Sequence, residues 1–241
     1  MTKRLAILLL ALVPGLALAA GGAPLLESGA SIGNPASLQR GAAMFMSYCS
    51  GCHSLGYQRL SRAAADLGIP EDVAMDKLNF TGAKFGDHIK ASMRPADGEK
   101  WFGKAPPDLS LIARSKPGGP DWLYTFLKSF YADESRPSGW NNTVLPGASM
   151  PHVLWELQGI QRPVYAAGHE GHIERLELAT PGKLSPQEYD AAIRDLVNFL
   201  TYVGEPAAMQ RTSLGVWVIL YLAAFTFLAW LLKKEYWRDV H

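Results

Sequence analysis

The 241-residue sequence has few cysteines and no excess of charge of one sign. Its two cysteines exclude the disulfide-dense scaffolds of small secreted domains. With 23 lysines and arginines against 22 aspartates and glutamates, it lacks both a polybasic nucleic-acid-binding surface and an acidic disordered tail. It contains no P-loop, internal repeat or low-complexity run. Composition therefore excludes several classes of function and identifies none.

The N-terminus has the three-part layout of a secretory signal peptide. Lys3 and Arg4 precede an apolar run that ends near Leu18, and residues 17–19 form an A-x-A cleavage site. The run is too short to cross a bilayer, which requires ~20 apolar residues. We therefore expect residues 1–20 to be removed and the following domain to be exported.

A second apolar run, residues 214–232, contains no charged residue and is close to the length of a membrane span. Basic residues follow it at Lys233, Lys234 and Arg238, so the positive-inside rule places the C-terminus in the cytoplasm. The alternative is a buried core helix, which rarely stays uncharged on every face.

These two segments divide the chain into four parts. They are a signal peptide at 1–20, a periplasmic domain at 21–210, a single transmembrane anchor at 211–233 and a cytoplasmic tail at 234–241. The predicted location is the inner membrane of a bacterial cell. Between Ala20 and Ser213 the charges are 20 acidic and 18 basic, a mild excess that permits docking with a basic partner.

The two cysteines, Cys49 and Cys52, are followed at once by His53, which gives the C-x-x-C-H pattern of covalent haem attachment. Thiols at this spacing can each add to one porphyrin vinyl group, while the adjacent imidazole binds the iron. A thioredoxin-like pair is expected near a βαβ pattern, which is not found, and a structural zinc site requires four ligands. A structural disulfide is the third alternative. The pattern predicts one covalently bound haem c per chain, with His53 as the proximal ligand.

The second axial ligand decides whether the iron is closed for electron transfer or open to substrates and gases. Met1 is removed with the signal peptide, Met44 and Met46 lie on the segment that leads into the motif, and Met209 adjoins the anchor. Three of the seven methionines are left, Met75, Met93 and Met150. Local context favours Met150, because Pro and Gly in residues 145–151 indicate an irregular loop that can lay a thioether over a ring. The alternatives are a core-filling methionine and ligation by His152, His169 or His172.

Two predicted helices frame the haem. Asn34 and Pro35 begin one helix, which delivers Cys49 to the motif. Residues 185–188 form a capping box that begins another, and Gly204 and Pro206 end it. A short helix is predicted for residues 61–67. The expected fold is an all-α haem domain with an irregular insertion, plus one C-terminal transmembrane helix.

The sequence resembles the cytochrome c1 family over essentially the whole mature chain. The match runs through residues 40–45, residues 48–54 around the C-x-x-C-H motif, the A-P-P-D-L-S segment at 105–110, Met150-Pro151 and the C-terminal anchor. C-x-x-C-H is common to all c-type cytochromes. The specific elements are therefore the P-P-D-L-S segment, the long insertion before it and the anchor.

The resemblance implies a cytochrome c-like fold and a set of haem-contacting residues. Cys49 and Cys52 would form the thioethers, and His53 and Met150 would bind the iron. Of the other contacts, Pro106 and Pro107 would pack near the ring, and a propionate would be faced by Arg114 or Lys116, for each of which a solvated surface charge is the alternative.

The resemblance also implies a function and partners. The chain would carry single electrons within the respiratory ubiquinol:cytochrome c reductase complex, without catalytic residues or enzymatic activity of its own. Its partners would be a cytochrome b subunit, a Rieske iron–sulfur protein as donor and a soluble cytochrome c or equivalent as acceptor. The alternatives are an anchored cytochrome that serves a terminal oxidase, a haem enzyme or gas sensor with an open sixth position, and a thiol oxidoreductase.

Overall fold

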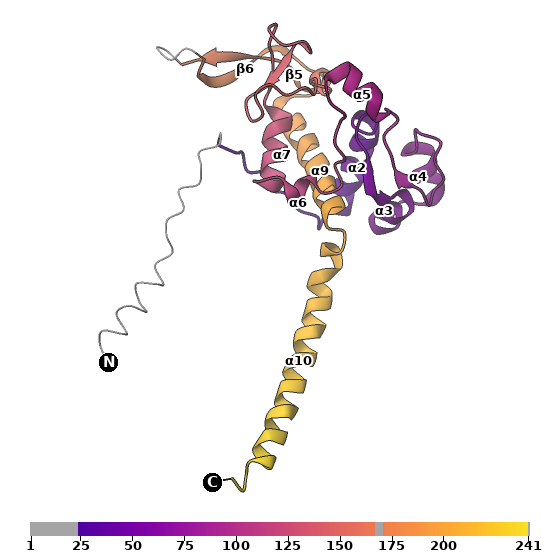
Figure 1. Cartoon of the computed structure of the whole chain (residues 1–241), viewed down its shortest axis with the longest axis vertical. Helices are drawn as coiled ribbons and strands as arrows, with labels where there is room; N and C mark the ends of the chain where they lie inside the picture. Colours follow the sequence, from indigo (N-terminus) through magenta and orange to yellow (C-terminus); the bar gives the residue numbers. More distant parts are fainter. Residues whose placement is uncertain (1–23, 167–170, 241) are drawn as a thin grey trace, which may run out of the picture.

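Two long helices, α2 (Pro35–Tyr48) and α9 (Pro186–Gly204), cross at the centre of the folded domain (Figure 1). The structure is a computed structural model that describes residues 24–166 and 171–240. The predicted signal peptide, residues 1–20, lies outside the described residues. The crossing brings the beginning and the end of the domain sequence together, and both helices contribute side chains to the hydrophobic core.

Both central helices begin where their capping residues predict. The Asn34 side chain accepts a hydrogen bond from the Ser37 amide (3.3 Å), and Pro35 is the first helical residue. At α9, Ser185 Oγ accepts from the Glu188 amide (3.3 Å), while the Glu188 carboxylate accepts from the Ser185 amide (2.8 Å). The predicted capping box is confirmed.

Gly41 makes the close crossing of α2 and α9 possible. A Cβ atom added at this position would lie 2.1 Å from the backbone oxygen of Asp195 on α9, so any larger residue would push the helices apart. The core that surrounds this contact comes from α2, α7 (Gly119–Lys128) and α9. Its fully or almost fully buried side chains include Leu38, Phe45, Leu123, Ile193, Leu196 and Phe199.

The prediction of an all-α domain holds only in part, because the described residues also form three antiparallel two-stranded sheets. The strands are β1 (Leu55–Arg59) with β2 (His88–Ile89), β3 (Phe130–Ala132) with β4 (Trp140–Asn142), and β5 (Gly159–Tyr165) with β6 (Ile173–Pro181). Most of these strands are short, and β6 is largely exposed, so they carry little of the apolar alternation that identifies a strand.

Shorter helices connect these elements. They are α3 (Leu60–Leu67), α4 (Glu71–Lys77), α5 (Pro95–Phe102), α6 (Ile112–Ser115) and α8 (Trp155–Gln158). The helix predicted for residues 61–67 is thus confirmed as α3. The insertion predicted to be irregular contains β1, β2 and helices α3 to α5.

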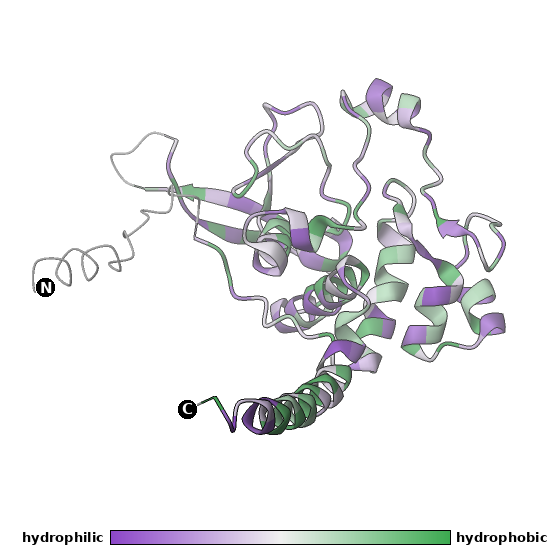
Figure 2. Ribbon diagram, turned by 60° about the horizontal axis from the view of Figure 1, so that its bottom comes forward, coloured by the Kyte–Doolittle hydropathy of each residue, from purple (hydrophilic) through white to green (hydrophobic). Residues whose placement is uncertain are grey.

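The last helix, α10 (Ala208–Tyr236), projects away from the rest of the chain (Figure 1). Hydrophobic residues cover it along most of its length (Figure 2). The segment Ser213–Tyr236 is long and apolar enough to cross a membrane, and none of the residues in its most apolar part is buried. A helix that is apolar on all faces and uncovered by protein is typical of a membrane span. The predicted anchor, residues 211–233, lies within α10.

Candidate haem site

The Cys49–His53 segment forms a tight turn directly after α2. Cys49 is the C-terminal cap of the helix, and its amide donates to the Phe45 carbonyl (2.8 Å). The amides of Cys52 and His53 then both donate to the Cys49 carbonyl, at 3.0 and 2.8 Å. This turn places both cysteines and the histidine on the lining of one pocket.

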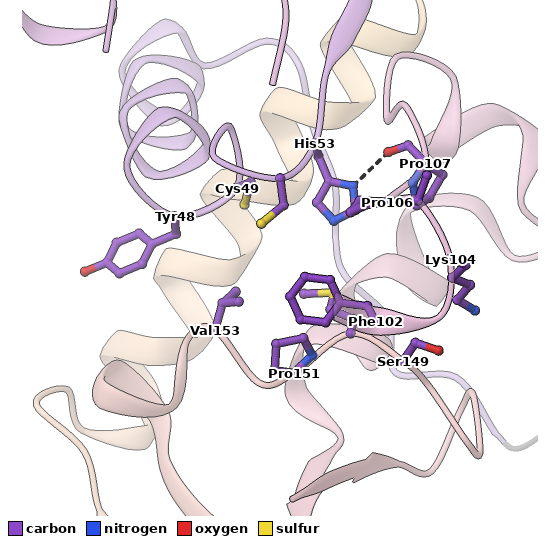
Figure 3. Close-up of a pocket in the computed structure, with 13 residues that line it drawn as sticks. Tyr48, Cys49, His53, Phe102, Lys104, Pro106, Pro107, Ser149, Pro151 and Val153 are labelled. Atoms are coloured by element: carbon purple, nitrogen blue, oxygen red, sulfur yellow. Dashed lines mark hydrogen bonds between the residues drawn. The ribbon is translucent and has the colours of Figure 1, made fainter. Parts of the chain in front are cut away.

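The pocket is a cleft that is partly open to solvent and lined mostly by apolar atoms, and its empty space, which includes the solvent at its mouth, is about 580 Å³. Its lining residues are Tyr48, Cys49, Cys52, His53, Phe102, Lys104, Ala105, Pro106, Pro107, Ser149, Met150, Pro151 and Val153. Ser149 and Pro151, which flank Met150, lie across the pocket from His53 (Figure 3). The pocket thus brings together six of the predicted site residues from three separate segments, namely Cys49, Cys52, His53, Pro106, Pro107 and Met150.

The His53 imidazole is oriented by a backbone carbonyl. Its Nδ1 lies 2.7 Å from the Pro107 oxygen, which can only accept, so Nδ1–H is the donor (Figure 3). The other nitrogen, Nε2, therefore keeps its lone pair free, as a metal ligand requires. Burial lowers the pKa of His53, although the Pro107 hydrogen bond and the Asp108 charge oppose this shift. The imidazole is held neutral and ready to bind a metal.

The P-P-D-L-S segment is tied to the residues that follow His53. The Leu109 amide donates to the Ser54 carbonyl (2.9 Å), and the Asp108 carboxylate accepts from the amides of Gly56 (2.6 Å) and Ser110 (2.8 Å). These bonds fix the Pro107 carbonyl that orients His53. The role of Asp108 was not predicted from the sequence, although an Asp two residues before Ser is a known turn-forming pattern.

The cysteines do not have the environment of a reactive redox pair. Both are free thiols, and Cys49 is buried with 8% of its surface exposed. Burial raises the pKa of Cys49 to about 12, with a smaller contribution from Cys52, whose own pKa is also raised by burial. Thiol oxidoreductases need a lowered thiol pKa, because the thiolate is the nucleophile. The raised pKa values are the opposite of what a thiol oxidoreductase uses, and they disfavour that alternative.

The described residues also offer no zinc site. Within residues 24–166 and 171–240, no group of three or more His, Cys, Asp or Glu side chains could hold a metal ion. The pocket instead combines two thiols, an imidazole with a free nitrogen and a thioether within apolar walls. This donor set fits a covalently attached haem with histidine and methionine ligands, and it does not fit a hydrated metal ion.

Met150 alone among the methionines of the described chain lines this pocket. Met44, Met75 and Met209 pack against the core, Met46 is buried on α2, and the Met93 sulfur lies near Gly98. The assignment of Met150 as axial ligand stays a prediction, and it is supported by the position of Met150 on the pocket lining.

The three alternative histidine ligands lie elsewhere or outside the described residues. His152 is 2% exposed, stacks on Phe130 with ring centroids 5.0 Å apart, and meets the Trp140 ring edge-on. Its pKa is lowered to about 4 by burial. His172 is exposed directly before β6, and His169 is not among the described residues.

The two predicted propionate partners do not line the pocket. Arg114 forms an ion pair with Glu205 (3.4 Å) at the junction of α9 and α10. Lys116 places its Nζ 4.3 Å from the centre of the Trp122 ring. Their contact with a propionate stays a prediction without support from this geometry.

The pocket wall also includes residues that the sequence did not indicate, among them Tyr48, Phe102 and Val153. Phe102 ends α5, which packs closely on the proline segment. A Cβ added at Gly98 of α5 would lie 2.5 Å from Pro106 Cδ. The only available signal was Pro95 as a helix start, which does not reveal what the helix covers.

Comparison with known proteins identifies the family to which the sequence is similar. The sequence model of the Cytochrome C1 family matches residues 33–170 and 183–240. Cytochrome c1 of Allochromatium vinosum is 49% identical over 246 residues, which cover 100% of both chains. A Nitrosomonas europaea protein named ammonia monooxygenase gamma subunit is 47% identical over 85% of this chain and 84% of its own. Cytochrome c1 of Rhodospirillum rubrum is 30% identical, with 84% and 81% covered.

Proposed function

The chain belongs to the cytochrome c1 family, and from this premise we propose that it is the membrane-anchored c-type cytochrome of a ubiquinol:cytochrome c reductase complex. It passes single electrons from a Rieske iron–sulfur protein to a soluble cytochrome c and converts no substrate by itself. The observation that carries the proposal is the apolar pocket lined jointly by Cys49, Cys52, His53 and Met150.

The pocket residues have separate tasks in this function. Cys49 and Cys52 would hold one haem c by thioether bonds, and His53 Nε2 and Met150 Sδ would bind its iron. When bound, the haem supplies a one-electron iron couple. The Pro107 carbonyl keeps the His53 ring in place and raises its basicity. Phe102 and Pro106 contribute apolar surface that keeps water from the site. A methionine ligand raises the reduction potential and closes the iron, as an electron carrier requires.

The anchor sets where the electron transfer takes place. Helix α10 crosses the inner membrane, with Lys233 and Lys234 in its last turn on the cytoplasmic side. The haem domain is then in the periplasm, beside a cytochrome b subunit in the membrane. The free cysteines are consistent with this compartment if both are consumed by thioether formation, since free thiols do not persist in an oxidising compartment.

Purification from native membranes in mild detergent tests the proposed complex. Co-purification of cytochrome b and a Rieske protein, together with a low-spin c-type haem spectrum, is the expected result. Recovery of oxidase subunits without those two proteins would assign the chain to a terminal oxidase instead. Strong carbon monoxide binding by the native ferrous protein would indicate an open sixth position and an enzyme or sensor.

A second candidate comes from the relative named ammonia monooxygenase gamma subunit. That name places a close relative in a different complex, so the same haem site would serve a monooxygenase. The same purification separates the candidates, because a monooxygenase assembly would bring its own subunits and no Rieske protein. The relatives named cytochrome c1 favour the reductase complex.

A further inference from the structure

The loop that precedes Met150 is hydrogen-bonded to the side chains of two neighbouring asparagines, Asn141 and Asn142, at the end of β4. Asn142 is completely buried, and its Oδ1 accepts from the amides of Val144 (2.9 Å) and Leu145 (3.1 Å). The half-buried Asn141 accepts from the Gly147 amide (2.8 Å) through its own Oδ1. Three backbone amides of the loop are thus bonded to two side chains.

The two asparagines are themselves held in place. Asn142 Nδ2 donates to the Phe126 carbonyl (2.8 Å), and Ser129 Oγ donates to Asn142 Oδ1 (3.1 Å). Asn141 Nδ2 donates to the Asp133 carboxylate (2.8 Å). These bonds connect the loop to α7 and to the β3–β4 hairpin, both of which contribute side chains to the hydrophobic core.

Arg136 provides a further hold on the same loop. Its Nη2 donates to the Gly147 carbonyl (3.1 Å), so Gly147 is bonded on both its donor and its acceptor side. Gly147 has a φ of +78°, a conformation that favours glycine. Residues 143–149 form no helix or strand, and the backbone bonds of the loop are those of the Thr143 amide to the Ser129 carbonyl (3.2 Å) and of the Ala148 amide to the Leu145 carbonyl (3.1 Å). The side-chain bonds to Asn141, Asn142 and Arg136 therefore supply most of what holds the loop three residues before Met150.

We propose that Asn141 and Asn142 are positioning residues that keep the Met150 thioether over the haem pocket. This inference rests on the proposed function, because the position of Met150 matters only if it binds iron. A thioether is a neutral ligand on a flexible side chain, so its ligation depends on how rarely its loop opens. Removing one side-chain hold leaves the haem attached at Cys49 and Cys52 and lets the sixth position open.

Substitution of Asn141 in the full-length haem protein tests the proposal. Asn141→Ala is expected to increase the fraction of ferrous protein that binds carbon monoxide by roughly tenfold, the change that loss of about one hydrogen bond produces. The reduction potential and the methionine–ferric charge-transfer absorption should fall, while the haem stays covalently attached.

A charge exchange distinguishes position from electrostatics. Asn141→Asp alone places a second carboxylate next to that of Asp133. The two charges repel each other, so the loop should loosen and the sixth position of the iron should open. The double variant Asp133→Asn/Asn141→Asp has the same net charge as the native protein and restores both hydrogen bonds, so it should recover the native potential and low carbon monoxide binding. Failure of this double variant to recover, with native stability, would overturn the proposal.

Asn79→Ala is the matched control. Asn79 is also half-buried, and its side-chain Nδ2 donates to the Ala83 carbonyl of a loop (2.6 Å). It does not line the haem pocket. It should leave the potential unchanged. If Asn141→Ala behaves like Asn79→Ala while Met150→Leu opens the iron, the positioning role is wrong and the proposed function stands. If Met150→Leu also changes nothing, the axial assignment itself fails.

Discussion

At the scale of single residues, the site depends on partners that lie far from the haem-binding motif in the sequence. His53 is oriented by the carbonyl of Pro107, and that carbonyl is fixed in turn by Asp108. Met150 reaches the pocket from a loop that two asparagines hold. The C-x-x-C-H motif therefore predicts the cofactor, whereas the hydrogen bonds around it show what holds His53 and the loop before Met150 in place.

Met150→Leu is expected to leave the haem attached, lower its reduction potential and allow the ferrous iron to bind carbon monoxide. Leucine has a similar volume but no ligand atom, so packing changes little while the sixth position opens. Redox titration and carbon monoxide difference spectra measure the effect. Met93→Leu, outside the pocket, is the control, and a native potential and spectrum in Met150→Leu would refute the assignment.

At the scale of elements, the helices framing the pocket were predictable because their signals are local. The Asn34-Pro35 start and the box at Ser185–Glu188 each lie within a few residues of the helix they begin. The strands were not predicted, because β2, β3 and β4 have only two or three residues each, too few to show an alternation. The hydrogen bond from the Gly147 amide to Asn141 could not be predicted either, since it depends on a loop folding back on a strand.

Gly41→Ala should destabilise the domain by about 2 kcal/mol, because a methyl group at the α2–α9 crossing has no room and overpacking a core costs ~1–3 kcal/mol. Denaturant unfolding of the haem protein measures the change. Gly86→Ala is the control, since a Cβ there meets no atom within 4 Å. Equal stabilities for the two variants would contradict the close crossing.

The segment at residues 24–33 should contribute a pH-dependent part of the stability. Asp121 on α7 accepts from Ser28 Oγ (2.6 Å) and the Ser28 amide (2.8 Å), and these bonds lower the pKa of its carboxyl group. The contribution is therefore present above the unfolded pKa of about 3.9 and is lost as the pH falls below it.

Asp121→Asn keeps an acceptor oxygen but removes this titration. The free energy of unfolding of the variant should depend less on pH between about 5 and 2 than that of the native protein, which denaturant titrations at several pH values measure. An unchanged acid dependence would show that Ser28 does not hold the ionised form.

At the scale of the whole molecule, the chain consists of two parts suited to different environments, a haem domain suited to water and an apolar helix suited to lipid. The apolar side chains of α10 are exposed along its length, whereas the domain buries its own core. Both segments were recognisable from the sequence, because hydrophobic length and a covalent attachment motif are not altered by tertiary context. The prediction that Arg114 or Lys116 faces a propionate came from the family resemblance, which does not determine the direction of a side chain in this chain.

Truncation after Ser213 should release the haem domain from the membrane. The truncated protein is expected in the periplasmic soluble fraction with its haem attached and its native low-spin spectrum, because the pocket residues all precede the cut. Cell fractionation with haem staining measures this outcome. Retention of the truncated protein on membranes stripped of partner subunits would show that α10 is not the anchor.

The intact mass of the denatured polypeptide tests the central claim most directly. After denaturation and acid extraction, the native chain should exceed the mass of its processed sequence by one haem, and Cys49→Ser/Cys52→Ser should lack that addition. A native chain with the mass of the polypeptide alone, its pigment extracted or absent, would contradict the account.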